Sequence, residues 1–83
     1  MTNYLIYRHG ANAANQSMTP VMAIDIVAAK NKQEAIAISK GQITCYNNQF
    51  LSAVAESKAN KTDWFEAATE IAIREIEKQV SKH

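Results

Sequence analysis

Short hydrophobic segments with the period of a strand precede two longer segments with the period of a helix. Residues 4–8 are aromatic and aliphatic and predict a first strand, and residues 21–29 alternate as a second. Residues 50–56 predict a third strand, although their alanines would also fit a helix. In the second strand we expect the even-numbered side chains to face the core. Asp25 would then lie near water or pair with a cation such as Arg8.

The first helix is predicted by its capping residues. Asn31 is a good N-cap and Glu34 follows three residues later, which is the pattern of a capping box. The end of this helix is open from the sequence alone. It either stops at Gly41 or passes through that glycine, at a cost of about 1 kcal/mol, and ends near Tyr46.

The second helix is predicted to be long, and its apolar stripe is broad. A capping pattern at residues 63–66 starts it, and helical periodicity continues to about residue 82. Such a helix is about 30 Å long, against about 23 Å for a seven-residue strand, so it should overhang its own sheet. A stripe without a local partner predicts an interface. The candidate interface residues are Trp64, Phe65, Ala72, Ile76 and Val80.

The order strand, strand, helix, strand, helix predicts an α+β fold with a small three-stranded sheet. A right-handed crossover through the first helix makes the second and third strands parallel, with the first strand between them and antiparallel to both. We expect both helices to pack on one face of this sheet. At this length we also expect residues 1–83 to form one domain.

Chain length limits how stable a monomer can be. Folding of 83 residues hides only about 63% of the extended chain's surface. Cys45 is the only cysteine, so no internal disulfide can form, and with His9 and His83 it does not complete a zinc site. We predict no metal and no cofactor. Self-association, or docking in a larger assembly, is the expected source of extra stability.

Charge and hydropathy exclude several classes of partner. Nine basic and eight acidic side chains leave almost no net field, which disfavours a general nucleic-acid binder. No apolar run reaches the ~18 residues of a membrane span. Residues 1–3 lack the positive charge of a signal peptide, and no apolar core with a cleavage site follows. With an unpaired cysteine, this composition predicts a cytoplasmic protein.

Residues 5–10, Leu-Ile-Tyr-Arg-His-Gly, form a strand that runs into an Arg-His-Gly triplet. This segment resembles the opening of the histidine phosphatases, which implies His9 as the phosphate-accepting nucleophile and Arg8 as a phosphate ligand. That chemistry also needs a second Arg and a second His or carboxylate. Only Arg74, in a predicted surface helix, and His83, at the end of the chain, remain. We therefore reject the phosphatase interpretation and predict that the chain is not an enzyme.

A second resemblance covers about half of the chain. The segments that carry it are Tyr4-Leu5-Ile6-Tyr7-Arg8, Ile26-Val27-Ala28-Ala29 and Glu34-Ala35-Ile36. They resemble the small structural subunit of the phenylacetyl-coenzyme A oxygenase. The loop at residues 9–20 and the long final helix depart from that family. The resemblance implies a non-catalytic domain that pairs with other subunits, and no functional residue is carried over.

Polar side chains should gather where the first strand ends and the third begins. They are Arg8, His9, Asn12, Asn15, Gln16, Asn47 and Asn48. Together they could hydrogen-bond a small polar ligand, with Arg8 binding a carboxylate or phosphate. Alternatively, Asn and Gln occupy these turns because they bond their own backbone, which is the interpretation we favour.

From these patterns we expect a non-catalytic interaction or assembly domain. Its predicted partner is a second copy of the chain or a larger protein assembly, reached through the final helix or a sheet edge. The alternative is a small-ligand or regulatory binding module that uses the polar loops at residues 8–17 and 47–49.

Overall fold

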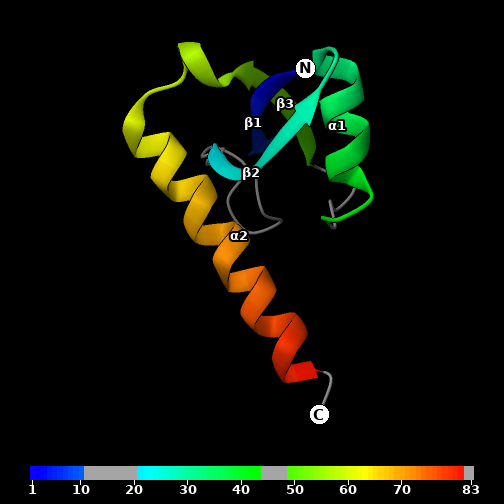
Figure 1. Cartoon of the computed structure of the whole chain (residues 1–83), viewed down its shortest axis with the longest axis vertical. Helices are drawn as coiled ribbons and strands as arrows, with labels where there is room; N and C mark the ends of the chain where they lie inside the picture. The colour runs from blue at the N-terminus through cyan, green and yellow to red at the C-terminus, as the bar shows by residue number, and fades with distance from the viewer. Residues whose placement is uncertain (11–20, 44–48, 82–83) are drawn as a thin grey trace.

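The computed structural model describes residues 1–10, 21–43 and 49–81 (Figure 1). Its elements in chain order are β1 (Thr2–His9), β2 (Met22–Ala29), α1 (Lys32–Lys40), β3 (Phe50–Ala55), the 3-10 helix η1 (Glu56–Lys58) and α2 (Lys61–Ser81). The α+β class, the element order and the long final helix are confirmed. Gly41 caps α1, and its N–H donates to Ile38 O, so the helix does not pass through the glycine.

The sheet has the order β2-β1-β3, and β1 is antiparallel to both neighbours, as predicted. The register of β1 with β2 contains a bulge. Ile6 is opposite Asp25, whereas Tyr7 is opposite Ala23, so Ile24 has no partner of its own. A bulge of this kind shifts the alternation of side chains between the two faces of a strand.

The prediction of which side of β2 faces the core is confirmed for Met22 and Ile24 and wrong from Asp25 onward, beyond the bulge. Directly opposed residues share a face, so Asp25 lies on the face of Ile6. α1 packs on this face, where the core consists of Tyr4, Ile6, Ile24, Val27, Ala29, Ala35, Leu51 and Ala53. Asp25 is 3% exposed, whereas Ala28, which was expected inside, is exposed. Asp25 tolerates burial because three donors reach its carboxylate.

The two helices do not share a face of the sheet, in contrast to the prediction. Tyr7 belongs to the face opposite α1, and its hydroxyl donates a 2.7 Å hydrogen bond to Asp63 Oδ2 at the start of α2. From there α2 runs beside the outer edge of β2, and Figure 1 shows the strands between the two helices. Polar contacts to Tyr7 and to the β2 edge hold α2 in this position, which the apolar periodicity does not reveal.

Helix α2 begins two residues before the predicted capping pattern. Asn60 Oδ1 accepts a 2.7 Å hydrogen bond from Asp63 N–H, so Asn60 is the N-cap and the predicted cap at Asp63 is wrong. The expected overhang is present. Every side chain from Glu75 to Val80 is exposed, and Figure 1 shows the last turns of α2 extending beyond the sheet. Among the described residues, no helix is long and apolar enough to span a membrane.

Candidate functional site

The inward side of α2 binds the sheet mainly through polar side chains. Glu66 Oε1 accepts a 2.7 Å hydrogen bond from Ala23 N–H. Arg74 Nη1 donates at 2.7 Å to Ile24 O, so both contacts satisfy backbone groups of β2. Ala67 is the fully buried side chain of α2. The helix therefore packs closely against β2 through a small buried side chain, and Ile71, one turn later, is the half-buried larger apolar residue on this side.

Asp25 links three elements through one buried carboxylate. Oδ2 accepts a 2.6 Å hydrogen bond from Ser39 Oγ of α1. Oδ1 accepts from Ile26 N–H at 3.0 Å and from Arg74 Nη2 of α2 at 2.9 Å. This ion pair replaces the two possibilities expected for Asp25, a solvent-facing position or a partner such as Arg8.

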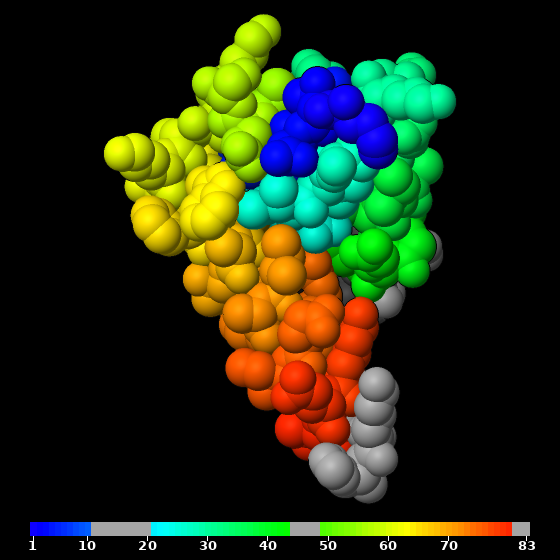
Figure 2. All heavy atoms as spheres, viewed as in Figure 1, coloured from blue at the N-terminus to red at the C-terminus, as the bar shows by residue number. Residues whose placement is uncertain are grey.

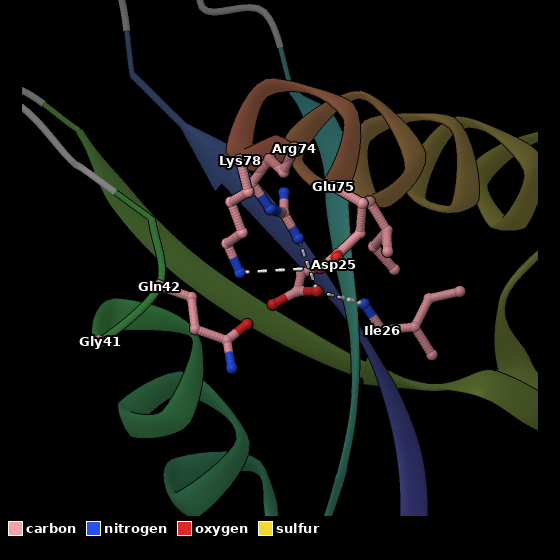
Figure 3. A pocket seen from close by; sticks show the side chains of 8 residues that line it. Asp25, Ile26, Gly41, Gln42, Arg74, Glu75 and Lys78 are labelled. Carbon is pink, nitrogen blue, oxygen red and sulfur yellow. Dashed lines mark hydrogen bonds and ion pairs between the residues drawn. The ribbon is translucent and has the colours of Figure 1, made fainter. Parts of the chain in front are cut away.

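A half-open cleft of about 400 Å³ lies beside the ion pair, between β2, the end of α1 and the second half of α2. Figure 3 shows Arg74 and Asp25 directed toward each other, with Gln42 across the cleft. The charged side chains that line it are Asp25, Arg74, Glu75 and Lys78. These two cations and two carboxylates cancel, and both oxygens of Asp25 already accept hydrogen bonds. The arrangement is that of a structural ion pair rather than a binding site for an ion.

Tyr7 holds the first turn of α2 to the central strand. Burial, the hydrogen bond to Asp63 and the negative charges of Asp63 and Glu66 together raise the pKa of Tyr7 to about 12, with burial as the largest cause. The hydroxyl therefore remains a protonated donor at neutral pH, as the bond to Asp63 requires.

The outward side of α2 is apolar. At about 100° per residue, Phe65, Ala72, Ile76 and Val80 fall within an arc of ~80°, roughly opposite Ala67. Phe65, Ile76 and Val80 are 63%, 60% and 67% exposed. We call this surface the outward face of α2, and its residues are Thr62, Phe65, Ala68, Thr69, Ala72, Ile73, Ile76, Gln79 and Val80. None of them carries a charge, and Lys61, which falls in the same arc, lies at the N-terminal end of the helix before this face begins. Figure 2 shows α2 as a column that projects from the body of the molecule.

Trp64 borders the outward face at its N-terminal end. Its ring meets Phe65 edge to face, with centroids 5.4 Å apart, and its Nε1 donates a 3.3 Å hydrogen bond to Glu56 Oε2. The five predicted interface residues are therefore all exposed on α2, four of them on one side and Trp64 on the flank. Ile73, which is also exposed, extends the face beyond the predicted set.

The structure describes only part of the predicted polar ligand site. His9 Nε2 is hydrogen-bonded to Ser52 Oγ at 2.7 Å, and its ring stacks on Phe50 with centroids 4.7 Å apart. Arg8 is half-buried nearby on β1. The other predicted residues, Asn12, Asn15, Gln16, Asn47 and Asn48, lie outside the described residues. A ligand site at this end of the sheet therefore stays a prediction.

Comparison with known proteins does not supply a function. No protein-family model matches the chain, and no curated protein or solved structure matches it significantly. Within residues 1–10, 21–43 and 49–81, no group of three or more His, Cys, Asp or Glu side chains is arranged to hold a metal. The outward face of α2 is thus the feature from which a function can be argued.

Proposed function

We propose that this chain is a non-catalytic assembly domain, in which the outward face of α2 binds the same face of a second copy. The observation that carries the proposal is the orientation of the helix. A helix at the surface of a soluble protein normally turns its apolar stripe to the core. Here α2 turns Glu66 and Arg74 to the sheet and Phe65, Ile76 and Val80 to solvent.

The outward face is complementary to itself when two helices pack antiparallel. With the two-fold axis between Ala72 and Ile73, Phe65 lies beside Val80 of the second copy. Thr69 then lies beside its Ile76, and Ala72 beside its Ile73. Each pair combines a larger with a smaller side chain, so ridges on one helix meet grooves on the other. No charge is buried, because the outward face has none.

The energy expected from this contact is moderate. Burial of the exposed part of Phe65, Ile76 and Val80 is worth about 1–2 kcal/mol for each side chain. Six such side chains in two copies contribute roughly 6–12 kcal/mol, against an association cost of ~4–15 kcal/mol. The proposal therefore predicts association that depends on concentration rather than a permanently locked dimer.

The test is multi-angle light scattering after size exclusion, over a wide concentration range. Ile76→Asp places a carboxylate in the middle of the outward face and should lower the average mass at each concentration. Glu77→Gln is the matched control, because it changes the charge by one in the same turn of α2 without altering the outward face. Equal masses for the wild type, Ile76→Asp and Glu77→Gln would refute the proposal.

A further inference from the structure

The two outer edges of the sheet differ in how they are protected. At β2, Glu66 and Arg74 of α2 bond the backbone of Ala23 and Ile24. At β3, the described elements that pack closely are β1 beside it and α1 on one face. Helix α2 contacts β2 and β1. Within the described part of the chain, a helix therefore covers the outer edge of β2, and the outer edge of β3 has no such cover.

The sequence of β3 also lacks the usual devices against pairing between sheet edges. Phe50-Leu51-Ser52-Ala53-Val54-Ala55 contains no charged residue, no proline and no glycine. Natural edge strands are commonly protected by charges, prolines or bulges. Phe50 is 60% exposed although its ring stacks on His9, so a large part of an aromatic side chain at this edge faces solvent.

We propose that β3 pairs with β3 of a second copy, antiparallel about a two-fold axis at Ser52, to form a continuous six-stranded sheet. Directly opposed residues in a sheet share a face, so the axis must pass through a residue rather than between two. With the axis at Ser52, Phe50 lies opposite Val54 of the second copy, and Leu51 lies opposite its Ala53. Moving the axis to Ala53 would leave Phe50 without a partner in the other strand.

Several features favour a second copy as the occupant of this edge. The pair of Phe50 with Val54 is the aromatic and β-branched type that stabilises cross-strand contacts, and it occurs twice around the axis. It also covers the exposed Phe50 ring. No like charges meet, because β3 has none. With strands ~4.8 Å apart and α1 in contact with all three strands, and so roughly over the central one, the two α1 helices would lie about 14 Å apart and would not overlap.

This pairing does not rest on the function proposed for α2, because it uses a different element. Two different self-complementary contacts on one chain link more than two copies. The wild type should therefore exceed twice its 9.2 kDa mass at high concentration. Disruption of either contact alone should leave a dimer, and disruption of both should leave a monomer.

The first experiment is chemical cross-linking of Ser52→Cys with a short bismaleimide, in a Cys45→Ser background that also carries Ile76→Asp. Contact through α2 is thereby weakened, and the two new thiols would face each other across the axis. Ser57→Cys, at an exposed position of η1, is the matched control in the same background. We expect a cross-linked dimer for Ser52→Cys and almost none for Ser57→Cys. Equal cross-linking of the two variants, or none of either, would overturn the proposal.

The second experiment places like charges on the axis. Ser52→Lys should weaken the β3 contact roughly fivefold or more, because two lysines would be directly opposed. Ser52→Thr, which keeps the hydroxyl near His9 and suits a strand, should retain the wild-type mass. Far-UV circular dichroism checks that both variants fold. If Ile76→Asp alone yields a monomer, the β3 contact is refuted and the α2 contact stands. If Ser52→Lys alone yields a monomer, the β3 contact stands and the α2 proposal fails.

Discussion

Replacing Arg74 with methionine tests how α2 is held to the sheet. Met keeps much of the length of the side chain but removes both hydrogen bonds of the guanidinium, the one to Ile24 O and the one to Asp25 Oδ1. The substitution leaves a carboxylate almost fully buried without its counter-ion. If the contact holds α2 as the structure indicates, the folded state should be clearly destabilised.

The expected loss can be estimated from the exposure of the two partners. A hydrogen bond that involves a charged group contributes about 1.5–3 kcal/mol, and breaking a buried ion pair by removing one partner costs ~3–5 kcal/mol. The side chain of Arg74 is 24% exposed and that of Asp25 is 4% exposed, so water reaches the pair from the arginine side. We therefore expect a loss of about 2–3 kcal/mol, which corresponds to about 8 °C or more in Tm for a domain of this size.

Urea unfolding followed by circular dichroism measures this loss, at a concentration low enough to suppress association. Glu70→Gln is the control, because Glu70 lies four residues before Arg74 and could pair with it along the helix surface. A double-mutant cycle with Asp25→Asn should show a coupling of at least ~1 kcal/mol. A loss below ~0.5 kcal/mol for Arg74→Met, or an equal loss for Glu70→Gln, would refute this account of how α2 is held.

Three further substitutions test other contacts of the same framework. Tyr7→Phe removes the hydroxyl whose pKa rises from 10.0 to about 12. Between pH 10 and 12 only the unfolded chain releases this proton, so the free energy of unfolding of the wild type should fall by about 1–2 kcal/mol relative to that of the variant. Parallel profiles of unfolding free energy against pH would contradict this. Asn60→Ala should cost about 1 kcal/mol in urea unfolding, and no loss would mean that Asn60 is not the N-cap. Ser39→Ala removes a donor to buried Asp25 and should cost about 1–2 kcal/mol by the same assay, whereas a neutral result would show that water replaces the hydroxyl.

The elements could be predicted from the sequence because period and capping are local properties. The face on which each β2 side chain lies could not be predicted, because the bulge at Ile24 shifts the alternation and no feature of the sequence marks its position. The partner of Asp25 lies 49 residues away in sequence, and its pairing depends on where α2 crosses the edge of β2. Likewise, two overlapping capping patterns begin at Asn60 and Asp63, and the bond from Tyr7 to Asp63 belongs to the structure in which Asn60 is the cap.

The candidate interface was only partly predictable for the same reason. Periodicity identifies an apolar stripe on the final helix but does not state whether the stripe faces the sheet or solvent. That choice depends on Glu66 and Arg74, whose long side chains reach backbone groups of β2. The open edge at β3 likewise follows from the strand order and from the position of α2 beside the opposite edge.

The most direct test of the central claim is the mass of the wild type by light scattering across concentrations, measured beside Ile76→Asp and Glu77→Gln. A wild-type mass that rises with concentration, a lower mass for Ile76→Asp and no change for Glu77→Gln would support assembly through the outward face of α2. A wild type that stays at 9.2 kDa throughout the range would contradict it.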